Sequence, residues 1–201
     1  RVKMLSGTVS APLIADGDTG FGGLLNVQHT VRGYEDAGAA AIQIEDQEVP
    51  KKCGHTPDRR VIPLDDMTAK IKVAAESRDS SDFLIVARTD SRTKHGLDEA
   101  LHRAEAFVNA GADILFVEAP ESIEEMERIG KTFDAPLLVN VVEGGKTPVL
   151  SRQEYIDLGY SVAIYPAAGF LAMGAALKSV YGQLSETGSS IGAGAPLEEF
   201  M

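Results

Sequence analysis

The stretch of this sequence richest in residue types that do chemistry is residues 44–55, which read IEDQEVPKKCGH. It leaves an apolar run through two carboxylates, Glu45 and Asp46, and then reaches Cys53, the only cysteine of the chain. Nearby positive charge favours the thiolate form of cysteine, so we expect Cys53 to be reactive. Carboxylates at a strand end, followed by an activated thiol, are typical of an active site. The basic residues that flank the cysteine are Lys51, Lys52 and His55.

A purely structural role for this segment is the alternative. A lone cysteine is more often a small buried hydrophobe than a catalyst. However, Pro50 cannot donate to a strand ladder and Gly54 favours a turn, so the segment is predicted to be a loop. Its neighbours are too polar to bury a cysteine, which favours the functional interpretation.

The composition indicates a soluble globular domain, with 44% hydrophobic and 24% charged residues in a chain of 201. The net charge of −11 argues against nucleic acids and anionic membranes as partners. We find no signal peptide and no apolar stretch near the roughly 18 residues of a membrane span. One cysteine cannot form an internal disulfide, so the cytoplasm is the expected compartment.

Short apolar runs alternate with amphipathic segments along the chain. The runs are rich in Val, Ile, Leu and Phe and lack polar alternation, which suits parallel strands buried on both faces. Strict alternation of such strands with helices predicts an α/β protein with a parallel sheet. The six predicted strands are residues 12–15, 39–44, 83–87, 113–117, 136–139 and 161–164.

The predicted helices have recognisable ends and buried faces. Asn26 is expected to cap a helix that buries Val27 and Val31. Apolar spacing predicts further helices around residues 64–71 and 97–108. Two capping boxes mark helix starts, namely Ser122 with Glu125 and Ser151 with Glu154.

Polar residues follow every predicted strand. Functional side chains at the carboxyl ends of all strands are how a (β/α)8 barrel builds its site, whereas an open doubly wound sheet concentrates them at one crevice. We therefore predict a TIM-type barrel. A closed barrel takes eight units and about 250 residues, so two N-terminal units are expected to lie outside this chain, with residues 1–8 as the end of a helix. The residues after the strands are Asp16, Asp18, Glu45, Asp46, Arg88, Asp90, Glu118, Asn140, Glu143 and Tyr165.

The turn after the first strand reads DTGFGG over residues 18–23. A glycine-rich turn can cradle phosphate, but this spacing matches neither the dinucleotide fingerprint nor the P-loop. Asp16, Asp18 and Glu45 are instead expected to meet at adjacent strand ends. Oxygen ligands suit a hard cation such as Mg2+, with Mn2+ as a substitute. In the structural alternative these carboxylates only pair with Arg88 or cap helices.

Six ordered motifs indicate a family. Together they resemble the isocitrate lyase and phosphoenolpyruvate mutase superfamily over about residues 12–184. Their wording is most similar to its small lyases, the group of methylisocitrate lyase, 2,3-dimethylmalate lyase and petal-death protein. The motifs are ADGDTG at 15–20, IEDQ at 44–47, KKCGH at 51–55, ARTD at 87–90, VEAP at 117–120 and NVVEGGKTP at 140–148.

This resemblance implies roles for individual side chains. Asp16 is expected to hold Mg2+ directly, and Asp18 and Glu45 through water. Arg88 is expected to grip a substrate carboxylate, and the KKCGH segment to be a mobile loop that closes over the substrate. The implied catalytic residues are Cys53, Lys51, His55, Arg88 and Glu118. The implied substrate contacts are Gly54, Arg88, Asn140 and Thr147.

The resemblance also implies an assembly. The last barrel helix is expected to pack in a neighbouring subunit of a homotetramer, a dimer of dimers, and residues 170–177 are rich enough in Ala and Gly for such packing. A further aspartate of the metal shell is expected to precede residue 1. We interpret residues 1–184 as an incomplete barrel domain and residues 185–201 as a flexible tail.

The implied activity is Mg2+-dependent cleavage of a carbon–carbon bond. A 2-hydroxy dicarboxylate or tricarboxylate, of alkylmalate or methylisocitrate type, would give a 2-oxo acid such as pyruvate and a carboxylate, with Cys53 as proton donor. Three alternatives remain. They are oxaloacetate hydrolysis or decarboxylation, to which Ser91 could offer a hydroxyl; phosphonomutase chemistry, for which the family replaces KKCGH; and a non-catalytic ligand-binding barrel. The substrate's side group stays open, because one methylene is worth only about 1–3 kcal/mol.

Overall fold

The computed structural model describes residues 1–53, 58–195 and 198. Within these ranges each predicted strand is confirmed, with its ends shifted by no more than two residues. The strands are β1 (Ile14–Asp16), β2 (Ala41–Glu45), β3 (Leu84–Thr89), β4 (Ile114–Val117), β5 (Leu137–Asn140) and β6 (Tyr160–Ile164). The helices are α1 (Val2–Ser6), α2 (Leu24–Asp36), α3 (Leu64–Ser77), α4 (Arg92–His95), α5 (Leu97–Asn109), α6 (Ile123–Thr132), α7 (Arg152–Asp157) and α8 (Ala168–Thr187).

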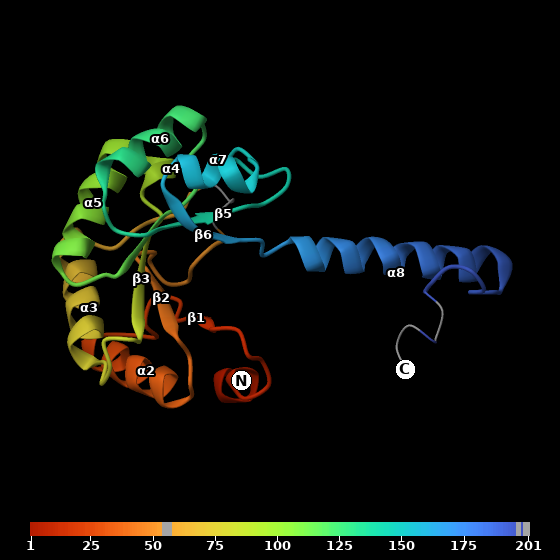
Figure 1. Cartoon of the computed structure of the whole chain (residues 1–201), viewed down its shortest axis with the longest axis horizontal. Coiled ribbons are helices and arrows are strands. Elements are labelled where there is room, and N and C mark those ends of the chain that lie inside the picture. Colours follow the sequence, from red (N-terminus) through yellow and green to blue (C-terminus); the bar gives the residue numbers. More distant parts are fainter. Residues whose placement is uncertain (54–57, 196–197, 199–201) are drawn as a thin grey trace.

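The strands form one parallel sheet in sequence order, from β1 to β6. The sheet is curled, and α2, α3, α5 and α6 lie along its outer side (Figure 1). A doubly wound sheet would reverse its strand order and carry helices on both faces, so the predicted curl of a partial barrel is confirmed. Across the described residues β1 and β6 are the edges of this sheet, and no pairing joins them.

Alternate strand residues face opposite sides of the sheet, because the side-chain period of a strand is two. One set, including Ile42 and Ile44 on β2, packs under the helices against residues such as Phe107. The other set forms a smaller core inside the curl. This burial of both faces explains why β4 and the first three residues of β5 read as continuous apolar runs. The inner core consists of Ala41, Val86, Ile114, Phe116 and Leu138.

Helix α2 begins earlier than the sequence predicts. Its N-cap is Gly23, and Asn26 lies inside the helix, so the prediction that Asn26 caps it is wrong. The Asn26 side chain packs on Gly22 instead, where an added Cβ would lie 2.7 Å from the Asn26 Cγ. The predicted buried face is confirmed, since Val27 and Val31 are fully buried.

The two predicted capping boxes differ. The Ser151–Glu154 box at α7 is complete. At α6, Ser122 accepts from the Glu125 N–H, but the box is only half formed. The Glu125 carboxylate accepts instead from Arg92 at 2.6 and 3.0 Å and from the Glu121 N–H at 2.8 Å. The Glu125 carboxylate therefore binds the Arg92 guanidinium and does not complete the capping box with Ser122.

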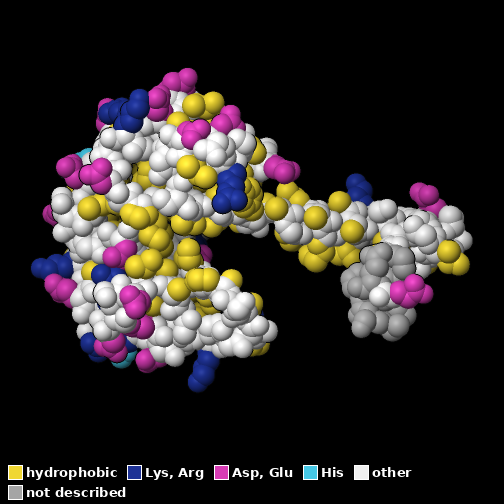
Figure 2. All heavy atoms as spheres, in the orientation of Figure 1, with side chains coloured by type: hydrophobic (Ala, Val, Ile, Leu, Met, Phe, Trp, Pro, Cys, Tyr) yellow, Lys and Arg dark blue, Asp and Glu magenta, His cyan; other side chains and the backbone are white. Residues whose placement is uncertain are grey.

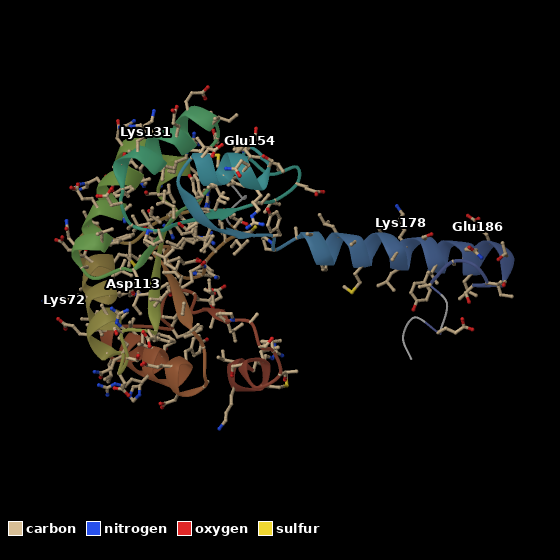
Figure 3. The ribbon with its side chains drawn as sticks, in the orientation of Figure 1. Lys72, Asp113, Lys131, Glu154, Lys178 and Glu186 are labelled. Atoms are coloured by element: carbon tan, nitrogen blue, oxygen red, sulfur yellow. The ribbon has the colours of Figure 1, made fainter. Side chains whose placement is uncertain are left out.

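Helix α8 leaves the curled body and projects from it (Figure 1). None of its residues is buried, and hydrophobic side chains gather along the part nearest the body (Figure 2). The labelled Lys178 and Glu186 lie on it, well away from the sheet (Figure 3). The helix continues beyond residue 184 to Thr187. Among the helices of the described residues, none combines the length and the apolar character needed to cross a bilayer.

Gly130 of α6 lies against the end of α7. A Cβ at this position would lie 1.9 Å from the carbonyl oxygen of Leu158. The added Cβ is fixed to one backbone and the Leu158 oxygen belongs to another, so no side-chain rotation relieves the overlap. We expect Gly130→Ala to lower the free energy of unfolding by about 1–3 kcal/mol, the usual range for overpacking.

Gly33 in α2 provides the matched control, because an added Cβ there meets nothing within 4 Å. Alanine is the better helix former, so Gly33→Ala should raise the free energy of unfolding by roughly 0.5–1 kcal/mol. Urea denaturation of both variants measures the two changes. Equal stabilisation by both would contradict the close contact between α6 and α7.

Candidate active site

The inner side of the curl carries the residues that the sequence singles out at strand ends. Ala15, Ile44, Ala87, Val117 and Val139 all pack in the core under the helices. The next residue along the chain therefore faces the opposite way, into the curl. In this way five predicted site residues share one face of the sheet: Asp16, Glu45, Arg88, Glu118 and Asn140.

Three carboxylates surround the ammonium group of Lys51. Its Nζ forms an ion pair with Asp18 and lies 3.6 Å from Asp16 Oδ2 and 3.5 Å from Glu45 Oε2. Burial alone would lower the pKa of Lys51, but the hydrogen bond to Asp18 and the surrounding negative charges outweigh it and raise the pKa. The structure thus brings the three predicted metal ligands together around one cation.

A tight turn sets the spacing of these carboxylates. A Cβ at Gly17 would lie 2.9 Å from the carbonyl oxygen of Gln43, so the turn can approach β2 only with glycine. Asp18 adopts a left-handed backbone with φ of 49°. Its N–H donates to Asp16 Oδ1 at 2.9 Å, and its carbonyl accepts from the Glu45 N–H at 2.8 Å.

Glu45 is the buried member of the acidic cluster. Within the described part of the chain its Oε1 is buried without a hydrogen-bond partner. Burial raises the pKa of Glu45 to about 7, although Arg88 and Lys51 oppose the rise. A bound cation would supply both the missing partner and the missing charge, and oxygen-only ligands suit Mg2+.

The acidic cluster as it stands is arranged around Lys51. No three acidic, histidine or cysteine side chains of the described residues are grouped closely enough to hold a metal ion directly. The ammonium lies where such an ion would compensate Asp16, Asp18 and Glu45. The ligand chemistry therefore fits a divalent cation, provided that the Lys51 side chain moves aside.

Arg88 lies next to this cluster, at the end of β3. Its Nε and Nη2 donate to the two carboxylate oxygens of Asp90, both at 2.9 Å. The guanidinium lies 3.8 Å from Glu45, 3.9 Å from Glu118 and 4.9 Å from the ring centroid of Phe116. Burial would lower the pKa of Arg88, but the charges of Asp90 and Glu118 outweigh it and raise the pKa. A permanently charged, fixed guanidinium suits recognition of a carboxylate.

Asn140 and Thr147 differ in their relation to the site. Asn140 Nδ2 lies 3.3 and 3.5 Å from the carboxylate oxygens of Glu118. Its Oδ1 is buried and, among the described residues, lacks a hydrogen-bond partner. Thr147 is also buried, but it does not belong to the lining of the cavity described next. The structure therefore brings Asn140, and not Thr147, to the predicted substrate space.

A cavity of about 440 Å3 lies at this end of the sheet. Cys53 is exposed and lines it together with the charged groups. Gly54 and His55, predicted to contact the substrate and to act in catalysis, lie outside the described residues. The lining residues are Glu45, Lys51, Lys52, Cys53, Arg88, Asn140, Val142, Pro166, Ala167 and Phe170.

The apolar wall of the cavity was not predicted from the sequence. Val142, Pro166 and Ala167 lie in the segments after β5 and β6, and Phe170 lies in the first turn of α8. Apolar residues outside the strands resemble ordinary packing residues in a sequence. For Val142, Pro166 and Ala167, the position a few residues after a strand was the only signal that could have found them, and Phe170 had no such signal.

Asp46 faces away from the cavity, although it adjoins Glu45. It is fully buried and accepts hydrogen bonds from the Thr89 hydroxyl at 2.7 Å, the Asp90 N–H at 2.8 Å and Arg103 at 3.2 Å. Burial raises its pKa to about 6 against these hydrogen bonds. Asp46 therefore ties β2 to β3 and α5, a structural role.

Ser91 is the residue that could offer a hydroxyl group to an oxaloacetate-type substrate. It is fully buried, and its hydroxyl is hydrogen-bonded to that of Thr89 at 2.8 Å. It does not line the cavity. In this structure the Ser91 hydroxyl therefore points to Thr89 and not into the cavity.

A curled parallel sheet with carboxylates and a guanidinium on its inner face at the strand ends is typical of a partial (β/α)-barrel protein. Residues 1–185 match the family model described as phosphoenolpyruvate phosphomutase. The chain belongs to this family, within the phosphoenolpyruvate mutase and isocitrate lyase superfamily. The resemblance drawn from the six motifs is confirmed.

Relatives with named activities are similar along most of the chain. The chain is 46% identical over 192 residues to 2,3-dimethylmalate lyase of Eubacterium barkeri, covering 96% of this chain and 66% of that protein. It is 46% identical over 181 residues to 2-methylisocitrate lyase of Aeropyrum pernix, covering 90% and 58%. The chain thus spans less than two thirds of the length of these relatives.

Solved structures agree in fold. A crystal structure of 2,3-dimethylmalate lyase superposes with a TM-score of 0.92 at 35% identity, covering 99% of this chain and 68% of that one. Oxaloacetate acetylhydrolase with 3,3-difluorooxalacetate gives 0.91 at 32%, covering 98% and 67%. Phosphonopyruvate hydrolase in complex with oxalate and Mg2+ gives 0.84 at 29%, covering 99% and 70%.

Proposed function

We propose that this chain forms most of the barrel of a divalent-metal-dependent carbon–carbon lyase. Its substrate is a 2-hydroxy dicarboxylate or tricarboxylate, which it cleaves to a 2-oxo acid such as pyruvate and a second carboxylate. The observation that carries the proposal is the cavity in which Glu45, Arg88 and Cys53 face the same space. The names of the two lyase relatives agree with this chemistry.

Asp16, Asp18 and Glu45 are the residues that would hold Mg2+ or Mn2+. The ion, when bound, would acidify the hydroxyl on C2 of the substrate. Lys51 offsets part of the negative charge of these three carboxylates. Because the Lys51 side chain also lines the cavity, it can turn from the carboxylates toward an anionic substrate.

Arg88 and Asn140 orient the substrate in this proposal. Arg88 offers a fixed positive charge for one carboxylate, and Asn140 offers an amide to a second oxygen. The opposite wall, which includes Val142 and Phe170, is apolar and suits an alkyl group on C2 or C3. A charged wall facing an apolar wall fits an alkylated hydroxy acid better than malate itself.

Cys53 is the proton donor. Once the C2 hydroxyl has passed its proton to a water molecule, the C2–C3 bond breaks and C2 becomes the carbonyl carbon of the oxo acid. The electron pair moves onto C3 and its carboxylate as an enediolate, which takes one proton on carbon from the Cys53 thiol. Lys51 and Lys52 line the same cavity, and the Cys53 thiolate regains a proton from solvent.

A substrate panel tests the proposed function directly. Purified full-length protein would be assayed with Mg2+ against 2-methylmalate, 2,3-dimethylmalate, methylisocitrate, malate and oxaloacetate. Pyruvate and oxalate would be measured separately. We expect pyruvate from at least one alkylated hydroxy acid, and no product from any hydroxy acid would contradict the lyase assignment.

Oxaloacetate hydrolysis is the second candidate, because the oxaloacetate acetylhydrolase structure superposes closely. The buried position of Ser91 gives no support to this candidate. Release of oxalate from oxaloacetate in the same panel would favour it. Phosphonomutase chemistry is the third candidate, and it is disfavoured by the presence of Cys53 in the cavity.

We further propose that two more βα units close the barrel between β6 and β1. The support is the exposure of β6: Ser161 and Ala163 are exposed, whereas the inward-facing Val162 and Ile164 are half-buried against the inner core. The protein is proposed to act in the cytoplasm, since its one cysteine gives no internal disulfide.

A second copy of the chain is proposed to cover α8, within a homotetramer that exchanges this helix. The support is its exposed apolar surface, which includes Met173 and Leu177. Burying such a side chain contributes about 1.5–3 kcal/mol. We expect Met173→Glu together with Leu177→Glu to dissociate the assembly in sedimentation velocity. Lys178→Glu, on the same helix, is the control and should leave it assembled.

A further inference from the structure

Asp90 lies buried between two arginines, and only one of them belongs to the site described above. Its carboxylate accepts from Arg88 at 2.9 Å on each oxygen, and its Oδ1 also forms an ion pair with Arg59. The side chains of Asp90 and Arg59 have no exposed surface. The group therefore carries one negative and two positive charges in a buried place.

The backbone around Arg59 is held against the end of β2. The Glu48 N–H donates to the Arg60 carbonyl, and the Ile62 N–H donates to the Asp46 carbonyl, both at 2.8 Å. The Arg59 Nη2 also donates to the hydroxyl of Thr93 in α4. These contacts hold the Arg59 guanidinium against Asp90 Oδ1, the oxygen that also accepts from Arg88 Nη2.

The charge of Arg59 changes the electrostatic potential at Arg88. If Arg88 and Asp90 were alone, the carboxylate would neutralise the guanidinium that faces an anionic substrate. Glu45 and Glu118, at 3.8 and 3.9 Å, would reduce the positive potential further. Arg59 shares the Asp90 charge, so a positive charge remains for the substrate carboxylate. Buried charges interact strongly because water screens them little.

We propose that Arg59 is a positioning residue that acts through Asp90 to keep Arg88 oriented and effective in binding a substrate carboxylate. Asp90 accepts hydrogen bonds from Arg88 Nε and from one hydrogen of Arg88 Nη2. The other N–H groups of the Arg88 guanidinium are left to donate to a ligand. The inference rests on the proposed function only in that Arg88 binds an anionic substrate.

The test compares Arg59→Met with Arg59→Lys and with Arg60→Met in the full-length protein. Arg60 is the matched control, because it is the adjacent arginine and is largely exposed, paired only with Glu48 at 2.9 Å in the described residues. Oxalate binding is measured by calorimetry with Mg2+ present, and KM and kcat with the best substrate of the panel. Thermal unfolding reports on stability separately.

We expect Arg59→Met to weaken oxalate binding and to raise KM by about tenfold or more, with kcat changed by less than about threefold. This follows from the strength of hydrogen bonds and ion pairs that involve charged groups. Arg59→Lys should recover most of the affinity, because it restores the charge. Arg60→Met should bind oxalate as the wild type does.

Unchanged oxalate affinity in Arg59→Met would overturn the inference, and so would a lowered melting temperature with oxalate affinity intact.

If Arg59→Met fails to fold, the Thr93→Val variant provides the test, since it removes only the hydroxyl that holds Arg59. We expect about threefold weaker oxalate binding, and wild-type affinity overturns the proposal. If the wild type cleaves no acid of the panel, weaker oxalate binding in Arg59→Met still supports the positioning role.

Discussion

Replacing Asp16 with asparagine should remove nearly all turnover and leave the protein folded. Asp16 lies at the exposed edge of the acidic cluster, with 60% of its side chain accessible, and its described ion pair is with Lys51. Loss of its charge therefore leaves the core unchanged but weakens cation binding. A bound metal supplies several kcal/mol of charge stabilisation in a reaction of this kind. Since about 1.4 kcal/mol is tenfold in rate, we expect turnover to fall on the order of 1,000-fold.

The measurements separate a metal role from a structural one. Mn2+ titration should show weaker binding in Asp16→Asn, and circular dichroism should match the wild type. Asp36→Asn, which removes an exposed carboxylate at the end of α2, is the control and should keep wild-type turnover. Chelator should inactivate the wild type, and Mg2+ or Mn2+ should restore it. Full activity in excess chelator would contradict the proposed metal dependence.

Changing Cys53 to serine should lower turnover by about 100-fold or more, the scale of general acid catalysis. Serine nearly matches cysteine in volume, so the cavity should keep its shape. A serine hydroxyl is a much weaker acid than a thiol and returns a proton to the enediolate slowly. Metal binding should survive, because no member of the acidic cluster is altered.

Alkylation provides an independent measurement of the Cys53 role. Iodoacetamide should inactivate the wild type, with oxalate slowing the reaction because it occupies the cavity that Cys53 lines. The Cys53→Ser variant should be insensitive to the reagent, since the chain has no other cysteine. Near-normal cleavage of every alkylmalate by Cys53→Ser would make the thiol structural and move oxaloacetate hydrolysis ahead.

The sequence was sufficient to predict the curled parallel sheet. Apolar runs without alternation are typical of strands buried on both faces, and consecutive βα units connect neighbouring parallel strands. The same pattern predicted that polar residues would gather at the carboxyl ends, as Arg88 and Asn140 do. Local periodicity carries this information, so no tertiary contact was needed.

Only the fold decided which residues of each strand face the inside of the curled sheet. Glu45 and Asp46 follow the same apolar run, and both look equally suited to a site. In the structure Glu45 faces the cavity and Asp46 is buried beneath α5. A strand that is apolar on both faces does not indicate which side is inner, because that depends on where the helices pack.

Contacts between distant segments also required the tertiary structure. Arg59 and Asp90 are 31 positions apart, and neither belongs to a periodic pattern that links them. Phe170 reaches the cavity only because α8 starts at its rim. Sequence patterns report on neighbours within one element, whereas the charge that reaches Arg88 depends on how separate elements meet in space.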